Sequence, residues 1–187
     1  MERLNIKEIA QGKELLAGAT SGTVLFSKMI LELKAVDEPQ PLYLDFTGVQ
    51  ATASFLRESA LALKGYCRNT QSNLYPVVAN ANNETLDDLE LAARQKGDAI
   101  IVCTLDTNDS VGNVRVLGIL EEKQKFTLDA VRELKTADAI ELSDRYEAEK
   151  IGATGWNNRL SNLSMKGLLI EEKKGRGKTY RFVLEGF

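Results

Sequence analysis

A helix with one apolar face is predicted near the carboxyl end of the chain. Trp156, Leu160 and Leu163 follow the i, i+4, i+7 spacing that places side chains on one side of a helix. These three side chains are therefore expected to pack inward. The helix is expected to span about residues 154–166 and to end at Gly167.

A β-hairpin is predicted directly after this helix. Residues 168–172 and 179–184 are short runs rich in Leu, Ile, Val, Tyr and Phe, and the segment KKGRGK at 173–178 separates them. The glycines of this segment allow the chain to turn at positive φ. The tip of the hairpin is therefore expected to be tightly turned and cationic.

Two further helices are expected upstream of these elements. The first covers Phe126–Leu134, whose apolar residues recur at helical spacing. The second is expected to begin after a cap at Thr136 and to reach about Tyr146, with Ile140 in the core.

The first 120 residues alternate between strand-like and helix-like runs. Apolar strands are predicted at 3–6, 42–46, 74–79, 99–105 and 111–120. A helical turn is predicted at 13–17, and amphipathic helices at 23–36, at 55–68 with Ser54 as its N-cap, and at 84–96. This order of elements predicts an α/β fold with parallel crossovers.

Length, composition and charge add a division into domains. The chain has 187 residues, of which 43% are hydrophobic and 27% charged, a composition typical of globular proteins. We expect an α/β domain at 1–122 and a second domain at 123–187. Residues 151–187 hold seven Lys/Arg and three Asp/Glu, a net charge of +4, whereas residues 1–150 carry −7. A basic end on an acidic body directs an anionic partner to one part of the chain.

The polar face of the 154–166 helix has the chemistry needed to read nucleic acid. Asn amides pair with adenine edges, hydroxyls bond to several bases, and Arg and Lys neutralise phosphates. The candidate DNA-binding residues on this helix and on the hairpin tip are Thr154, Asn157, Asn158, Arg159, Ser161, Asn162, Lys166, Lys173, Lys174, Arg176 and Lys178. The structural alternative is an ordinary amphipathic helix followed by a solvated lysine-rich turn.

The ordered combination W-N-N-R-L, G-L-L and K-G-R-G-K-T-Y-R-F resembles the winged helix-turn-helix modules of bacterial transcriptional regulators. The resemblance covers the chain from about Phe126. It implies that the 154–166 helix enters the major groove of double-stranded DNA while 173–178 follows phosphates or the adjacent minor groove. It also implies a homodimer, because one module covers few base pairs.

A second resemblance covers about residues 4–120. The segment LYLDFTGVQATASFLRESAL at 42–61 is similar to the signature of STAS-like domains, the fold of sulfate-transporter domains and anti-sigma-factor antagonists. The later segment VVANANNETLDDLELAARQKG resembles the next strand and helix of that fold. Ala53 stands where the antagonists carry Asp, and S-F-x-x-E, with Glu58, matches a divergent STAS-like group of unassigned function.

The STAS-like resemblance implies regulatory roles for Asp45 and Ser54. In anti-sigma-factor antagonists a partner kinase phosphorylates the serine that Ser54 matches. A helix N-terminus is suited to an added phosphate, because free amides and the helix dipole favour anions there. The structural alternatives are a plain N-cap at Ser54 and, at Asp45, a carboxylate that bonds nearby backbone amides.

Other chemistries lack the residues that they require. The chain has no histidine, and Cys67 and Cys103 are isolated, so we expect buried thiols and neither a metal site nor imidazole catalysis. No phosphate-binding loop, dinucleotide-binding glycine motif or nucleophile elbow occurs. We therefore expect no enzymatic activity and no cofactor. The absence of an apolar leader or a membrane-length apolar run predicts a cytoplasmic protein without membrane contact.

Together these patterns predict a DNA-binding transcriptional regulator whose STAS-like domain receives a signal or binds a protein partner. One alternative is a partner-switching protein-interaction module, controlled by a kinase-like ATPase that phosphorylates Ser54. Another is a regulator gated by a small molecule that binds near 45–54 or the Asn80 loop.

Overall fold

The computed structural model describes residues 1–175 and 177–187, and its architecture is mixed α/β, as the sequence predicts. The chain divides into two compact units, Met1–Ile119 and Leu120–Phe187. We refer to them as the N-terminal unit and the C-terminal unit. The sequence predicts this boundary between residues 122 and 123, three residues later than the structure has it.

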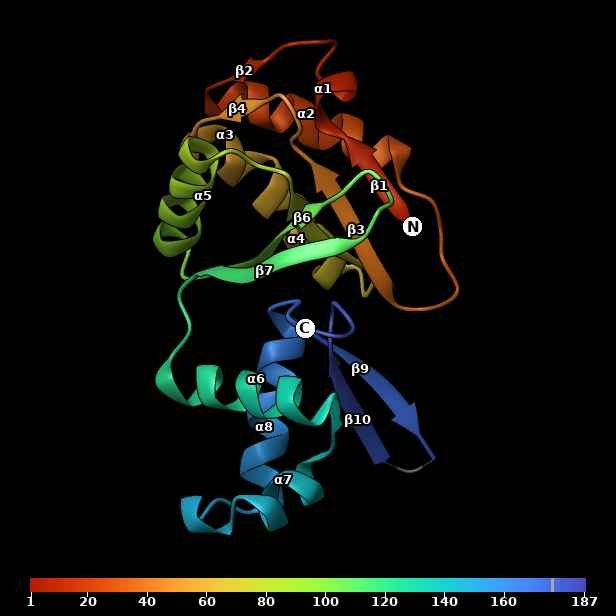
Figure 1. Ribbon diagram of the computed structural model, residues 1–187, viewed down its shortest axis with the longest axis vertical. Coiled ribbons are helices and arrows are strands. Elements are labelled where there is room, and N and C mark those ends of the chain that lie inside the picture. Colours follow the sequence, from red (N-terminus) through yellow and green to blue (C-terminus); the bar gives the residue numbers. More distant parts are fainter. Residues whose placement is uncertain (176) are drawn as a thin grey trace. The chain divides into compact units, whose positions relative to one another are not determined.

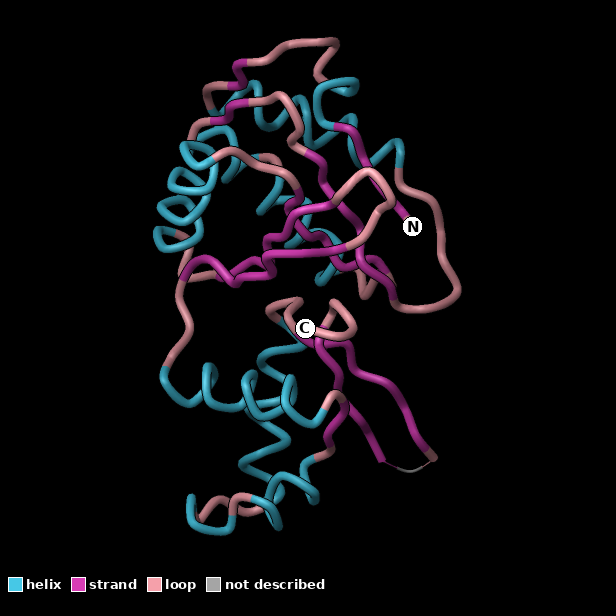
Figure 2. Tube along the Cα trace, viewed as in Figure 1, coloured by secondary structure: helices cyan, strands magenta, loops and turns pink. Residues whose placement is uncertain are grey.

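A five-stranded sheet forms the centre of the N-terminal unit (Figures 1 and 2). Its strand order is β1-β3-β5-β6-β7, in which the first four strands are parallel and the last is antiparallel to its neighbour. The strands are β1 (Glu2–Asn5), β3 (Gln40–Asp45), β5 (Leu74–Ala79), β6 (Ala99–Leu105) and β7 (Val111–Gly118). The predicted spans of β5 and β6 are confirmed without a shift, because both are uninterrupted apolar runs bounded by turn-forming residues.

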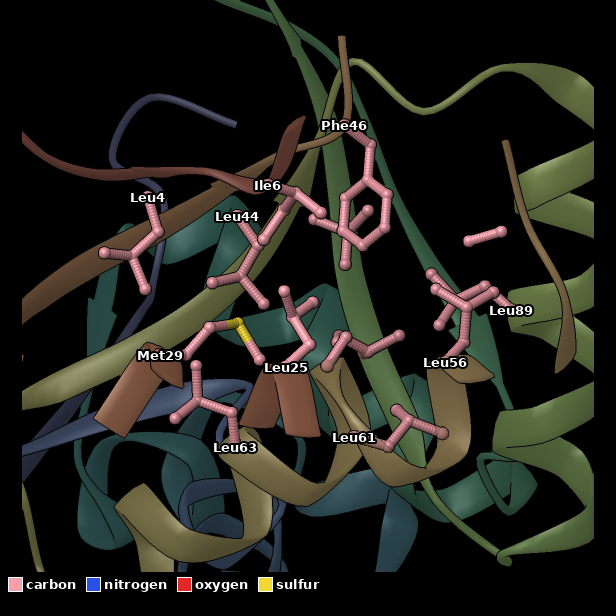
Figure 3. Packing of buried hydrophobic residues seen from close by; sticks show 14 of the residues in the cluster. Leu4, Ile6, Leu25, Met29, Leu44, Phe46, Leu56, Leu61, Leu63 and Leu89 are labelled. Carbon is pink, nitrogen blue, oxygen red and sulfur yellow. The ribbon is translucent and has the colours of Figure 1, made fainter. Parts of the chain in front are cut away.

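Helices of the N-terminal unit share one side of this sheet. They are α1 (Ile6–Ile9), α2 (Ala19–Glu32), α3 (Ala53–Glu58), α4 (Ala60–Asn69) and α5 (Asn83–Gln95). The parallel strands follow one another in a single direction, so right-handed crossovers return each helix to the same face. Accordingly, Leu44 of β3, Met29 of α2 and Leu63 of α4 belong to one buried apolar cluster (Figure 3).

The helical turn predicted at 13–17 is wrong. Leu15–Leu16 forms the short strand β2, which pairs in parallel with β4 (Gln50–Ala51). The backbone N–H of Gln50 donates to the carbonyl of Glu14 at 2.7 Å, and that of Thr52 donates to Leu16 at 3.0 Å. Partners distant in sequence therefore decide the conformation of this segment, and a local pattern does not reveal them.

The single helix predicted at 55–68, with Ser54 as its cap, is also wrong. The first helix, α3, has Thr52 at its N-cap position, so Ser54 is the second helical residue. The helix is then interrupted at Ser59, where α4 begins anew. Ser59 is buried, and its hydroxyl donates to the carbonyl oxygen of Phe55 at 2.7 Å. This bond satisfies a carbonyl at the interruption.

The C-terminal unit consists of helices and a three-stranded antiparallel sheet in the order β8-β10-β9 (Figures 1 and 2). Its elements are α6 (Glu122–Leu134), β8 (Thr136–Ala137), α7 (Ala139–Arg145), a 3-10 turn at Glu147–Glu149, α8 (Ala153–Met165), β9 (Leu169–Lys174) and β10 (Gly177–Phe182). The predicted helix and hairpin after residue 150 are therefore present, each within a few residues of the expected bounds.

Two expectations at the start of α7 are wrong. Thr136 does not cap the helix, because it belongs to β8 and pairs with Arg181 of β10. Asp138 is the cap, and its carboxylate accepts hydrogen bonds from the backbone amides of Ile140 and Glu141 at 2.8 and 2.9 Å. This later start places Ile140 in the first helical turn with 66% of its surface exposed, rather than in the core.

Candidate nucleic-acid interface

Helix α8 has a sharply divided surface. Trp156, Leu160 and Leu163 are each 0% exposed, as their spacing predicts. Of the candidate residues, Thr154, Asn157, Asn158 and Asn162 are exposed, whereas Arg159, Ser161 and Lys166 are half-buried. The helix ends at Met165, and Gly167 follows with φ +68°, a conformation that favours glycine. The amide-bearing side chains therefore face solvent on a helix whose opposite side is fixed in the core.

An aromatic cluster packs against the buried side of α8. The ring centroid of Trp156 lies 6.0 Å from that of Phe126 and 5.8 Å from that of Tyr146. The rings of Phe126 and Tyr146 meet edge to face at 5.2 Å. These contacts join α6, the end of α7 and α8, and they fix the rotation of α8 about its axis.

The indole and guanidinium groups of this cluster have specific environments. The guanidinium of Arg159 lies 5.2 Å from the centroid of the Trp156 ring, a cation–π distance. Among the described residues, the buried indole N–H of Trp156 has no hydrogen-bond partner. Arg159 is thus partly engaged by the protein itself, which limits its reach toward a phosphate.

The β9–β10 hairpin carries cations, but carboxylates of the same hairpin pair with two of them. The ammonium of Lys178 lies 2.7 Å from Glu171, and the guanidinium of Arg181 lies 2.7 Å from Glu172. Lys173 is exposed. The side chain of Lys174 and all of Arg176, both candidate DNA-binding residues, lie outside what the structure describes.

A surface hollow of about 380 Å³ lies between the start of α7, α8 and β10. Asn157 and Lys178, both predicted interface residues, line it together with Asp138, Ile140 and Thr179. The structure therefore brings the helix and the hairpin to one concave surface. Besides the Asp138 carboxylate, which caps α7, it combines an amide, a cation, a hydroxyl and an apolar side chain. These four kinds of group contact base edges, phosphates and thymine methyl groups.

Sequence reasoning missed Ile140 and Thr179 as members of this surface. The signal at Ile140 was present, because Asp138 is a stronger N-cap than Thr136 and shifts the helix by two residues. With α7 starting at Ala139, Leu142 becomes the buried position, which the structure shows. Thr179 gives no comparable signal, since strand residues alternate in direction and its register depends on β9.

Asp45 lies at the carboxyl end of β3 and is 3% exposed. One carboxylate oxygen accepts hydrogen bonds from the Arg3 guanidinium at 2.6 and 3.2 Å. The other accepts from the Thr47 hydroxyl at 2.7 Å, the Thr47 amide at 3.2 Å and the Asn80 side chain at 3.0 Å. Burial opposes ionisation, but these bonds outweigh it and hold the pKa of Asp45 below its ordinary value. The geometry fits the structural alternative, because the carboxylate is already saturated with donors.

Ser54 lies in the first turn of α3 and is half-buried. Its hydroxyl oxygen is 3.4 Å from that of Thr52. The structure does not bring Ser54 to Asp45 through any hydrogen bond among the described residues, so the two candidate regulatory residues form separate environments.

The two cysteines are buried and unpaired with each other. Burial raises the pKa of the Cys103 thiol to about 12, and the nearby charge of Asp45 contributes in the same direction. Burial also raises the pKa of Cys67. Both thiols are therefore protonated near neutral pH and are poor nucleophiles. Within residues 1–175 and 177–187, no cluster of three or more Cys, Asp or Glu side chains is arranged to hold a metal ion.

Comparison with protein-family models and with curated proteins gave no significant match for this chain. Among the described residues, every helix is too short or too polar to cross a lipid bilayer.

Proposed function

We propose that this protein is a DNA-binding transcriptional regulator whose C-terminal unit is a winged helix-turn-helix. The element order α6, β8, α7, α8, β9, β10 and the sheet order β8-β10-β9 support this proposal. In it, α7 and α8 form the helix-turn-helix, with α8 as the recognition helix, and the β9–β10 hairpin is the wing.

One observation carries the proposal. The exposed side of α8 presents three Asn amides, those of Asn157, Asn158 and Asn162, on a helix whose three apolar side chains are fully buried. The NH2 group of an Asn amide can donate to N7 of adenine while its oxygen accepts from the N6 amino group, so several Asn side chains on one exposed face suit the major groove. A helix held by an aromatic cluster presents such groups in a fixed orientation.

In the proposed complex α8 enters the major groove and the wing follows the neighbouring backbone. Asn157 and Asn158 contact base edges, whereas Lys173 contacts phosphates and adds affinity without sequence preference. Lys178 joins the phosphate contacts after leaving Glu171, 2.7 Å away. Two copies act together on two half-sites, because one helix contacts only a few base pairs.

We also propose that the N-terminal unit is a STAS-like domain that receives the signal or binds a protein partner. The segment that leads from the end of β3 to α3 supports this part of the proposal. It contains Asp45, Phe46, Thr47 and Gly48. It has the order of the signature that the sequence resembles.

The direct test is selection of DNA from a random duplex pool by the full-length protein, followed by binding measurements on an enriched sequence. Replacing Asn158 by Ala is expected to weaken binding to that sequence by about 1–3 kcal/mol and to relax the preference at one position. Replacing Lys173 by Ala is expected to weaken binding to all sequences alike and to lower the slope of log affinity against log salt by about one.

Asn108→Ala is the matched control, since Asn108 is an exposed Asn of the N-terminal unit. Its DNA affinity is expected to equal that of the unaltered protein. Two results together contradict the proposal. The selection enriches no sequence, and the Asn158→Ala and Lys173→Ala variants bind DNA with the same affinity as the unaltered protein.

A further inference from the structure

The N-terminal unit has a pocket that the proposed DNA-binding surface does not use. It lies between the segment after α1, the first turns of α2 and Phe55 of α3, and has a volume of about 270 Å³. Leu16, Leu25 and Phe55 line it with apolar surface, and each of the three is buried. For scale, a dry apolar cavity of about 150 Å³ accepts benzene. The pocket therefore has room for a ring-sized body and one further group.

The same pocket is also lined by polar residues, and those that carry a charge are all cationic. Lys13 and Lys28 line it, and so do the hydroxyl-bearing residues Thr20 and Ser21. Lys28 donates one hydrogen bond to the carbonyl of Ile9 at 3.4 Å, and an ammonium has three donors. None of the described residues that line the pocket is acidic. Its fixed charges are thus positive only.

The backbone of α2 adds to this positive character. Thr20 and Ser21 stand in the first turn of a 14-residue helix that begins after Gly18 and has no acidic residue in that turn and no side-chain cap. Amides in the first turn of a helix have no partner within the helix, and the helix dipole favours an anion beside them. Lysine and hydroxyl groups therefore border the apolar lining of the pocket, beside the amino-terminal end of α2.

We propose that this pocket binds a small monocarboxylate with an apolar body, such as an arylalkanoic acid. The carboxylate lies toward Ser21, Lys13 and Lys28, and the apolar body contacts Leu16, Leu25 and Phe55. The occupied site connects the segment before β2 to α2 and α3, and its lining residue Phe55 follows Ser54 directly in the sequence. The inference does not depend on DNA binding, and the site differs from the 45–54 and Asn80 regions considered from the sequence.

The proposal is tested by isothermal titration calorimetry on the full-length protein with three probes. Phenylacetate carries both parts of the expected ligand, 2-phenylethanol carries the ring without the charge, and acetate carries the charge without the ring. Phenylacetate is expected to bind saturably and at least about tenfold more tightly than either other probe, since a buried contact and a charge contact each contribute about 1.4 kcal/mol or more.

Variants of α2 locate the site. Ser21→Glu places a carboxylate beside the proposed anion position and is expected to weaken phenylacetate binding about tenfold or more. Folding is expected to be preserved, because an acid in the first turn of a helix is favourable. Ser21→Gln has the same size without the charge and is expected to retain binding within about threefold. Thr23→Glu adds the same charge at an exposed residue outside the pocket lining and is expected to change affinity less than about twofold.

Three results overturn the proposal. They are no saturable phenylacetate binding at millimolar concentration, equal affinity for 2-phenylethanol and phenylacetate, and equal affinity of the Ser21→Glu and unaltered proteins. DNA binding by the same preparations is measured separately, so the failure of this proposal and the failure of the proposed function are distinguishable.

Discussion

At the residue scale, Asp45 shows how a charge is kept in the interior of the N-terminal unit. Its two oxygens receive hydrogen bonds from Arg3, Thr47 and Asn80. Asn80 in turn accepts from the backbone amide of Leu105 at 2.7 Å. The carboxylate therefore joins β1, β3, the end of β5 and β6, and these connections replace the water that it loses.

Asp45→Asn is expected to destabilise the protein by about 2–3 kcal/mol at neutral pH, because it removes charge-assisted hydrogen bonds and leaves an amide facing Arg3. The measurement is the free energy of unfolding in urea. Asp109→Asn is the control, since Asp109 bonds the same Arg3 at 3.1 Å but is 53% exposed. Its effect is expected to stay below about 0.5 kcal/mol.

The pH dependence of the Asp45→Asn effect follows from the lowered pKa of Asp45. An unfolded Asp titrates near about 3.9, so the carboxylate contributes its full stabilisation above that pH and loses it as the pH falls toward the lower folded pKa. The stability difference between the two proteins is expected to be largest at neutral pH and to shrink below about pH 4. A difference that grows in acid contradicts this role.

The sequence predicts the burial of a residue correctly where helical periodicity determines it. It predicts the wrong residue where partners distant in the sequence determine the structure. Trp156 is buried as predicted because helical spacing alone places it. The sequence predicts caps at Ser54 and Thr136, whereas the caps in the structure are Thr52 and Asp138. Short polar residues lie close together at both sites, and tertiary packing selects among them.

At the scale of elements, the contact between α2 and α3 depends on a glycine. A Cβ added at Gly22 falls 2.6 Å from the carbonyl oxygen of Phe55 and 3.0 Å from Cβ of Glu58. These are α3 atoms, and the Phe55 oxygen already accepts the Ser59 hydroxyl. The two helices are therefore as close as a residue without a side chain allows.

Gly22→Ala is expected to cost about 1–3 kcal/mol, because α2 and α3 must separate or shift. Gly65→Ala is the matched control, since Gly65 lies within α4 and an added Cβ has no neighbour within 4 Å. Gly65→Ala is expected to stabilise the protein by about 0.5–1 kcal/mol. Thermal unfolding midpoints report both changes, and effects of the same sign contradict the argument.

The β9–β10 hairpin limits its own attraction for an anion. Glu171 engages Lys178 and also accepts a hydrogen bond from the Tyr180 hydroxyl at 3.1 Å. If the hairpin is a wing, Glu171→Gln is expected to raise DNA affinity about two- to fivefold at low salt, because Lys178 is released for phosphate contact.

Glu172→Gln is the matched control for this change, because it alters the net charge equally. It loosens Arg181, which still has Glu185 at 3.2 Å. A smaller gain in affinity is expected from Glu172→Gln than from Glu171→Gln. Equal gains indicate a general charge effect rather than the release of Lys178.

Long elements were more predictable than short ones. β5, β6 and α8 have five or more residues with one consistent period, so their sequence specifies them. β2 and β4 have two residues each, and only their mutual pairing makes them strands. The ion pairs of the hairpin were not predictable, because they depend on cross-strand register.

At the scale of the whole molecule, each unit contains buried apolar residues of its own. In the C-terminal unit these include Leu128, Val131, Leu142, Trp156, Leu160 and Leu163. A fragment of residues 120–187 is therefore expected to fold alone, with a stability of about 3–5 kcal/mol. Cooperative urea unfolding followed by circular dichroism checks this, and a non-cooperative melt contradicts it.

The sequence indicated the α/β character and the charge asymmetry of the chain, but not the strand order. Strand order requires knowing which runs pair, and similar apolar strands do not encode their neighbours individually. Nor did it indicate the hollow beside α8 or the pocket beside α2, since each combines residues from three separate segments.

Trp156 is the only tryptophan of the chain, and its indole is fully buried beneath the exposed face of α8. Selective excitation of indole fluorescence therefore gives an optical signal from the C-terminal unit alone. The pocket proposed for carboxylates belongs to the other unit, and its lining contains no indole. A change in emission when phenylacetate is added would thus measure communication between the two units without any label.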